Sequence, residues 1–411
     1  MTTISNPTSQ LTSAIGLCLL YFSSLLPTLA SSSINELNGK PWIRHTIDNT
    51  SLGADGARLA DFDRDGDLDI ITGWEQGNLT RIYLNPGKGK VEQPWPLLTV
   101  GAEASPEDAI MIDLNNDLMM DAVSATEGKN NTIYVHRRSK NGETHWQTKA
   151  FQVTREKQAW MYLHPLDVDG LNNLDIITGS KNPNGAIGWL CSPDDPWALE
   201  AWTWHPLRKS GWIMSLFTVD MDDDGLLDIL YSDRKTESAS IGYLKNPGPQ
   251  ANRLKQPWPD RLIGAQNEEV MFIDHSPHTE HTRRMIAGAI KPNTIAIFIE
   301  KTEQSWTRSN LTIEANTGTS KAVKFADIDR DGQIDLVYSC EHAKNHRSGL
   351  IWLKKTSDQT WTAYDISGRP GVKFDLIQTL DLDQDGDLDV ITCEEVENLG
   401  LIWYENPLGS P

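Results

Sequence analysis

A nine-residue acidic loop recurs along this chain at nearly constant spacing. Its clearest copy, DFDRDGDLD, begins at Asp61, and three further copies begin at Asp220, Asp327 and Asp381. Carboxylates at loop positions 1, 3, 5 and 9, with a glycine at position 6 for a sharp turn, supply the oxygen ligands that calcium prefers. Each copy continues into apolar and β-branched residues, whereas an EF-hand would continue into a helix. The loop therefore predicts a calcium-binding turn between two β-strands.

The complete copies predict about four calcium ions, one in each loop. The expected ligands are Asp61, Asp63, Asp65, Asp67 and Asp69, then Asp220, Asp222, Asp224 and Asp228, then Asp327, Asp329, Asp331 and Asp335, and finally Asp381, Asp383, Asp385 and Asp389. In a weaker copy at Asp113, Leu118 replaces the glycine and must adopt a turn conformation that glycine takes more easily, so its occupancy stays open. The copy at Asp167 lacks the third ligand, and none of the motif remains near Asp274.

With the weaker copies included, the repeats start at residues 61, 113, 167, 220, 274, 327 and 381. A fixed period of this size is typical of an array, a solenoid or a propeller. Each unit reads as four short strands, which in the first copy are Ala57–Ala60, Ile70–Thr72, Arg81–Leu84 and Trp95–Val100. We therefore predict an all-β fold, a seven-bladed β-propeller with four strands per blade.

The last repeat ends near Pro407 and has no fourth strand of its own. The segment Pro41–Ile47, which precedes the first repeat, matches the fourth strands of other repeats. We expect this N-terminal strand to complete the last blade and close the ring, because closure leaves no sheet edge open. The propeller domain would then span residues 41–411.

The repeats resemble the FG-GAP/VCBS repeat family, whose blades look like those of the integrin α-subunit head. The resemblance covers roughly residues 41–407 and rests on the pattern Asp-x-Asp-x-Asp-Gly-x-x-Asp. It implies a secreted or cell-surface propeller that binds calcium. Members of the family serve in adhesion, in lectin-like binding and as enzyme domains, so the resemblance implies no single function.

The N-terminus carries an apolar run, Ala14–Ala30, that is followed by three serines. This pattern predicts a signal peptide over residues 1–30, a linker over 31–40, and a secreted, cell-surface or periplasmic protein. The first basic residue is Lys40, so the usual positive start of a signal peptide is missing. An uncleaved membrane anchor is the alternative, although the run is short for a span.

The net charge is −20, and the four complete loops contain 19 of the 57 acidic residues. The acidity is thus largely a property of the predicted metal sites, and a nucleic-acid partner is not expected. Beyond the signal peptide the chain has Cys191, Cys340 and Cys393. Cys340 and Cys393 occupy the same position in adjacent repeats, where we expect buried thiols, with a disulfide between the blades left open.

Strands alternate direction within a blade, so the start of strand 1 and the end of strand 2 lie on the face opposite the calcium loops. Residues there differ in every blade, which predicts a ligand site at the mouth of the central channel. Candidates for sugar stacking are Trp74, Trp160 and Trp212. The expected ligand-binding residues are Arg58, Glu75, Trp160, Lys181, Trp212, Arg234, Lys235, Glu269, Glu341, Asp375 and Glu395.

Recognition of an extracellular ligand, a glycan or small sugar, is the leading functional hypothesis. The first alternative is a lyase or dehydratase acting on an acidic or oxidised sugar, with His342 as general base beside Lys321 and Lys373. The second alternative is a protein-adhesion module. A purely structural interpretation also stays open, in which the charged residues form a girdle of salt bridges between blades.

Overall fold

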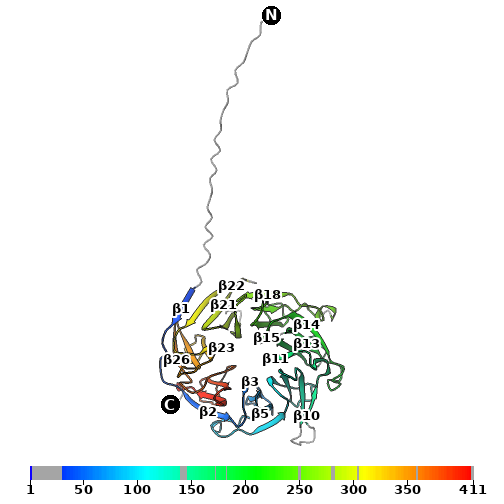
Figure 1. Cartoon of the computed structure of the whole chain (residues 1–411), viewed down its shortest axis with the longest axis horizontal. Helices are drawn as coiled ribbons and strands as arrows, with labels where there is room; N and C mark the ends of the chain where they lie inside the picture. The colour runs from blue at the N-terminus through cyan, green and yellow to red at the C-terminus, as the bar shows by residue number, and fades with distance from the viewer. Residues whose placement is uncertain are drawn as a thin grey trace.

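The computed structural model describes residues 1, 30–138, 146–171, 173–181, 183–248, 251–278, 283–302, 305–357 and 360–408. Its strands form seven sheets arranged around a central axis (Figure 1). Within each sheet, successive strands run outward from the centre of the ring to its rim. The predicted seven-bladed β-propeller is therefore confirmed.

The first three blades take their strands in chain order. Blade one contains β3 (Ala54–Ala60), β4 (Asp69–Trp74), β5 (Leu79–Tyr83) and β6 (Leu97–Gly101). Blade two contains β7 (Pro106–Ile112), β8 (Asp121–Thr126), β9 (Ile133–Arg138) and β10 (Trp146–Ala150). Blade three contains β11 (Ala159–Leu166), β12 (Asp175–Lys181), β13 (Ala186–Cys191) and β14 (Thr203–Lys209).

The next three blades follow the same order. Blade four contains β15 (Ile213–Val219), β16 (Asp228–Asp233), β17 (Ser240–Leu244) and β18 (Asp260–Gly264). Blade five contains β19 (Val270–His275), β20 (Met285–Ile290), β21 (Thr294–Thr302) and β22 (Ser305–Ile313). Blade six contains β23 (Thr319–Ala326), β24 (Asp335–Glu341), β25 (Leu350–Ser357) and β26 (Thr360–Asp365).

Blade seven combines the two ends of the chain, as predicted. It contains β27 (Gln378–Leu380), β28 (Asp389–Glu394), β29 (Gly400–Glu405) and the N-terminal strand β2 (Ile43–Asp48). The strand β2 runs antiparallel to β29, with His45 opposite Trp403. The ring of His45 stacks on that of Trp403 with a centroid distance of 4.2 Å. Hydrogen bonds and ring stacking together close the propeller.

Upstream of β2, the segment expected to be a linker also contributes a strand. β1 (Ala30–Ile34) runs parallel to β22 and adds a fifth strand to the rim of blade five. Ile34 is buried in the same apolar cluster as Leu311 and Ile313. Residues 30–34 therefore lie on the rim of blade five, and the chain then crosses to blade seven (Figure 1). Apart from Met1 and Ala30, the predicted signal peptide lies outside the described residues.

The apolar pattern of each strand follows its place in the blade. The second strands β4 and β28 are buried at every position, because neighbouring blades cover both of their faces. The outer strand β2 instead begins with exposed residues. Cys340 and Cys393 lie in this inter-blade core as free, buried thiols, in line with the prediction. Within the described residues, no helix is long and apolar enough to cross a membrane.

Candidate functional site

The four complete loops share one turn geometry. Asp61 accepts a hydrogen bond from the backbone N–H of Gly66 at 3.2 Å, and Gly66 has a φ of +99°. The same contact recurs at Asp220–Gly225, Asp327–Gly332 and Asp381–Gly386. In the weaker loop at Asp113, Leu118 adopts a φ of +70°, the turn conformation that the sequence required of it.

In each complete loop, the carboxylate at position 1 or position 3 has one buried oxygen without a hydrogen-bond partner among the described residues. These oxygens are the Oδ1 atoms of Asp61, Asp222, Asp329 and Asp381. An unpaired buried carboxylate oxygen is costly, and a cation at the centre of the loop would remove that cost. In the first two loops, the carboxylates at positions 1, 3 and 9 have oxygens within 4.8 Å of one another. The donor set therefore fits a hard divalent cation such as calcium.

Position 9 of the loop also anchors it to the blade. Asp69 accepts the backbone N–H groups of Phe62 and Asn85, each at 2.8 Å, and so joins the loop to the end of the third strand. Asp228 and Asp389 make the same pair of bonds in their blades. Burial raises the pKa of Asp69 to about 6 and that of Asp389 to about 7. A cation bound beside these carboxylates would keep them ionised.

Neighbouring acidic loops contact one another on this face. Asp67, which the motif predicted as a further ligand, accepts a hydrogen bond from Gln384 Nε2 at 3.1 Å. Arg330 donates to the carbonyl oxygen of Gly386 at 2.9 Å. Side chains within the loops thus join blade seven to blades one and six, in addition to any metal they hold.

On the opposite face, a cavity of about 250 Å³ lies on the axis of the ring. Side chains from all seven blades line it, as predicted for the mouth of the channel. The predicted site residues that it brings together are Glu75, Lys181, Trp212, Arg234, Lys321, Glu341, Lys373 and Asp375. Asp55, Glu107 and Glu127 line it as well. These three stand at the strand ends that define the face, and this position in the repeat is the signal that identifies them.

Two predicted stacking residues do not reach the cavity, which corrects the expectation from the sequence. Trp160 is buried, its ring packs edge-on against Trp204 at 5.1 Å, and its indole N–H faces two backbone carbonyls. Trp74 is fully buried and donates to the hydroxyl of Tyr83 at 2.9 Å. Both rings fill the core between blades, where aromatic side chains bury the most surface.

Trp212 does line the cavity, but two cations lie close to its ring. Lys181 Nζ lies 4.4 Å from the ring centroid and the guanidinium carbon of Arg234 lies 4.6 Å from it. Cation–π contacts of this kind hold the ring in place and compete with a sugar for its surface. Trp212 therefore lines the cavity, but its ring is not an open surface for sugar stacking.

Other predicted residues lie beside the cavity. His342 has a side chain that is 67% exposed, its Nδ1 lies 3.0 Å from Thr319 Oγ1, and it does not line the cavity. Lys235 and Glu269 pair with each other at 3.3 Å, outside the residues that line it. Glu395 is 6% exposed and lies behind Lys373.

Arg58 points into the channel below the cavity. Its Nε and Nη2 atoms donate to the two carboxylate oxygens of Asp108, both at 2.9 Å. Its guanidinium lies 3.8 Å from the ring centroid of Tyr162. Arg58 and Tyr162 also line a second cavity of about 330 Å³ along the channel. The buried Arg58–Asp108 pair therefore belongs to the wall between the two cavities and joins blades one and two.

The girdle of salt bridges that the sequence left open is present around the mouth of the channel. All but one of its pairs join neighbouring blades. The pairs are Lys181 with Glu127, Arg234 and Lys235 with Glu269, Lys291 with Glu341, Lys321 with Asp375, and, within blade seven, Lys373 with Glu395. The bases of this face are thus neutralised, and the girdle and the cavity coexist.

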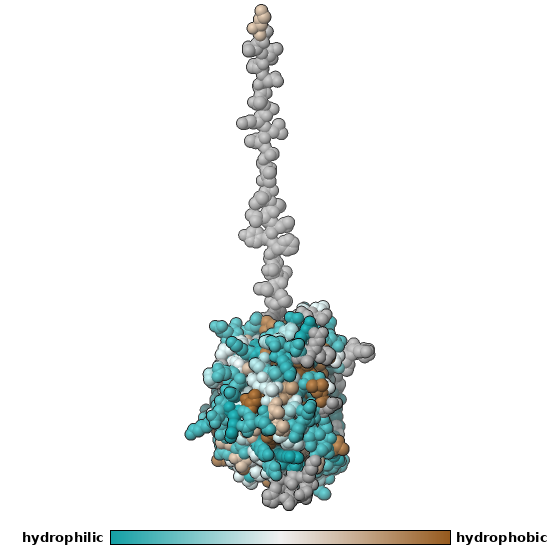
Figure 2. Space-filling view, turned by 90° about the vertical axis from the view of Figure 1, so that its right-hand side faces the viewer, coloured by the Kyte–Doolittle hydropathy of each residue, from teal (hydrophilic) through white to brown (hydrophobic). Residues whose placement is uncertain are grey.

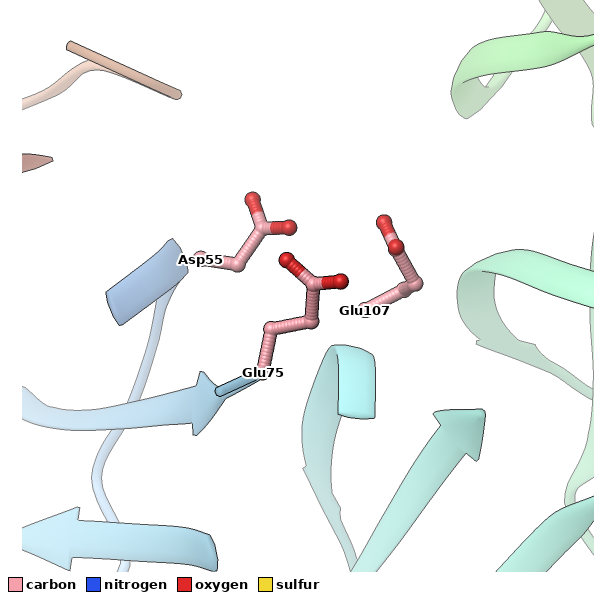
Figure 3. Close-up of side chains that lie close together, drawn as sticks. All are labelled: Asp55, Glu75 and Glu107. Carbon is pink, nitrogen blue, oxygen red and sulfur yellow. The ribbon is translucent and has the colours of Figure 1, made fainter. Parts of the chain in front are cut away.

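Three acids of the cavity have no ion-pair partner among the described residues: Asp55, Glu75 and Glu107. Their carboxylates converge, with oxygens within 4.8 Å of one another (Figure 3). Burial raises the pKa of Glu107. Burial, followed by the charges of Asp375 and Glu395, raises the pKa of Asp55 well above its usual range. The cavity is therefore most negative at the junction of blades one, two and seven.

Comparison with known proteins agrees with this architecture. Residues 61–124 match the FG-GAP-like repeat family. No curated protein matches the sequence. The crystal structure of BBS1N in complex with ARL6DN, soaked with lead, has a TM-score of 0.52 at 9% identity and covers 91% of this chain and 98% of that one. The same complex soaked with mercury has a TM-score of 0.51 at 10% identity, covering 89% and 97%. At such identities the similarity shows the fold alone.

Proposed function

Because this chain is a seven-bladed β-propeller of the FG-GAP type, we propose that it is a binding protein for a small extracellular ligand, a glycan or sugar. The observation that carries the proposal is the axial cavity of about 250 Å³, to which all seven blades contribute side chains. A concave site with a few convergent polar groups is the usual form of a small-ligand pocket. The calcium-loop face instead repeats one motif, as expected of a structural device.

The charges of the cavity favour a neutral or amino sugar over an acidic one. Acids outnumber bases among its lining residues, and Lys181, Lys321 and Lys373 are already held by carboxylates. An incoming sugar carboxylate would have to displace one of these partners. Hydroxyl and ammonium groups can donate to the carboxylates, which accept hydrogen bonds strongly.

The proposal includes calcium in the loops and export of the chain. Calcium bound at the four loops stabilises the ring without taking part in ligand recognition. The apolar N-terminal run directs the chain out of the cell, where calcium is abundant enough to fill weak sites.

The alternative of a sugar lyase has less support from the geometry. Its candidate base, His342, turns toward Thr319 and away from the lining of the cavity. Its two lysines pair with Asp375 and Glu395 and so are not available to stabilise an anionic intermediate. Removal of His342 separates the two hypotheses, because a lyase would lose its general base.

A protein partner is the second candidate, and one observation favours it. The two structures similar in fold are crystals of one complex, BBS1N with ARL6DN. Against it, the side of the ring that Figure 2 shows is mostly hydrophilic, with only scattered hydrophobic patches. Contiguous apolar patches and aromatic anchors are what a protein-docking surface usually presents.

A glycan array probed with the calcium-loaded protein tests the proposal. We expect binding to neutral or amino sugars, lost in Glu341→Gln and reduced in Trp212→Ala. His342→Ala, on the same face but outside the cavity, is the matched control and should bind as the wild type does. Binding that persists in both cavity variants, or no binding to any glycan, would overturn the proposal.

A further inference from the structure

The girdle of salt bridges leaves negative charge without a basic partner at one point of the cavity. Among the described residues, Asp55, Glu75 and Glu107 have no cation within ion-pair distance, although their carboxylate oxygens lie within 4.8 Å of one another. Asp55 lies in β3 of blade one, Glu75 follows β4 of the same blade, and Glu107 lies in β7 of blade two. Like charges so close in a partly buried site repel strongly unless a cation or protons neutralise them.

A second group of carboxylates meets the first at Asp55. Oxygens of Asp55, Asp375 and Glu395 also lie within 4.8 Å of one another. The Glu395 side chain is only 4% exposed, and its Oε1 atom has no hydrogen-bond partner among the described residues, while Oε2 accepts from Lys373 at 2.5 Å. A buried carboxylate oxygen with no donor, beside other carboxylates, is costly unless a cation or a proton neutralises it.

We propose that the junction of blades one, two and seven binds a divalent cation, held by Asp55, Glu75 and Glu107 with Glu395 beneath them. The calcium loops are each one continuous nine-residue motif. The ligands of this site come instead from several strand ends and share no sequence motif. It goes beyond the proposed function, since it requires no sugar.

The chemistry of the donors limits which cation fits. All of them are carboxylate oxygens, which favour hard cations such as calcium and magnesium over metals that prefer nitrogen or sulfur. Calcium accepts more oxygens and a less regular geometry than magnesium, and five carboxylates meet here. Lys321 and Lys373 pair with Asp375 and Glu395, and with Lys181 they also act on Glu107 at longer range. Three ammonium groups do not balance five carboxylates. The ion would join the first blade to the last across the seam of the ring.

The test counts calcium ions per chain in the full-length protein after equilibrium dialysis, with no sugar present. The double variant Glu75→Gln/Glu107→Gln should hold one ion fewer than the wild type. Glu237→Gln/Glu268→Gln removes the same two charges from outside the cavity and should hold as many ions as the wild type. Melting curves show whether each variant is folded. If the double variant does not fold, each single variant should weaken one calcium-binding step on the order of tenfold, as expected when a charged ligand is lost.

Equal ion counts in the wild type and the double variant would overturn the proposal, because protons alone would then relieve the repulsion. Propylamine, a small organic ammonium ion, serves as the competing probe in the same dialysis. If it binds at the junction in place of calcium, the proposal is also overturned, because the junction then belongs to an organic ammonium group. Failure here is distinguishable from failure of the proposed function. Glycan binding is measured separately. If the double variant loses one ion but no glycan binds, only the proposed function is wrong; if a glycan binds but the ion count does not change, only the cation site is wrong.

Discussion

Lys245 Nζ lies 3.2 Å from Asp224 Oδ2, inside a loop that carries the complete calcium motif. Lys354 repeats this arrangement two blades later, with its Nζ 3.4 Å from Asp331 Oδ2. Each lysine also contacts the carboxylate at position 3 of its loop. Lys245 directly precedes Asn246, whose backbone N–H bonds to the aspartate at loop position 9. The residue in the same place in blade one is Leu84, which precedes Asn85. Two of the four loops therefore contain a tethered cation and two do not.

Replacing these lysines should strengthen calcium binding. Lys245→Leu and Lys354→Leu give their loops the residue that blade one has, and each removes a positive charge that repels the ion. We expect calcium to bind the altered loop about tenfold more tightly, because repulsion from the lysine ammonium a few ångströms away weakens the binding free energy of calcium by at least about 1 kcal/mol. Calorimetric titration measures it, with Lys344→Leu, an exposed lysine, as control. Identical titration curves for all four proteins would show that the lysines swing away freely.

Removing calcium should lower the melting temperature of the protein. Metal that binds only the folded state stabilises it by mass action, so a chelator should shift the melting curve to lower temperature. Asp61→Ala, in a loop that contains no lysine, should reduce the size of this shift. A melting curve that does not respond to chelator would rule out a stabilising role for calcium.

Deleting residues 41–48 should open the ring. Without β2, the strand β29 would expose a bare edge, which promotes pairing with other chains. We expect aggregation and a lower melting temperature, measured by size-exclusion chromatography and calorimetry. A chain starting at residue 35 is the matched control, because it loses β1 but keeps every blade at four strands. If the deletion and the truncated control behave alike, β2 has no special role in closure.

Breaking the Arg58–Asp108 pair should destabilise the propeller strongly. Asp108 is 3% exposed and also accepts the backbone N–H of Leu163 at 2.7 Å, so Asp108→Asn leaves the guanidinium in a buried site without its counter-ion. We expect a loss of about 3–5 kcal/mol in the free energy of unfolding, measured in urea. Arg58→Met/Asp108→Asn should recover part of it.

A control for this pair lies at the exposed end of the girdle. Lys235→Met breaks a pair with Glu269 in which both side chains are more than a third exposed, and it should cost at most about 1 kcal/mol. Equal losses for Asp108→Asn and Lys235→Met would contradict the importance of burial.

The stability of the protein should decline in acid partly because of His136. The ring is fully buried between Ser124 and Thr148, and burial lowers its pKa to about 3 from the ordinary value of 6.5. The unfolded chain therefore takes up a proton at a pH where the folded protein does not. The free energy of unfolding should fall between pH 6.5 and 3, by about 1.4 kcal/mol per pH unit from this residue.

Urea unfolding across this pH range checks the expectation. His136→Gln should reduce the slope of stability against pH, whereas His342→Gln, at an exposed histidine, should not. The same slope in wild type and His136→Gln would show that other groups account for the acid sensitivity.

Much of the architecture could be predicted from local patterns in the chain. The repeated aspartates and glycines set the turn between the first two strands, and the period of 52 to 54 residues set the number of blades. The missing fourth strand of the last repeat implied that β2 would close the ring, and the antiparallel pairing of His45 with Trp403 confirms it. These features depend on turn chemistry and strand length, which a few neighbouring residues decide.

The choice of partners across blades could not be predicted in this way. Asp55 and Trp160 both stand where a first strand begins, yet one faces the cavity and the other fills the core between blades. Arg58 pairs with Asp108, which lies fifty residues away in the next blade. Such outcomes depend on how each blade is rotated against the next and on which side chain fills the space between them. Packing of whole blades, and no property of a single repeat, decides them.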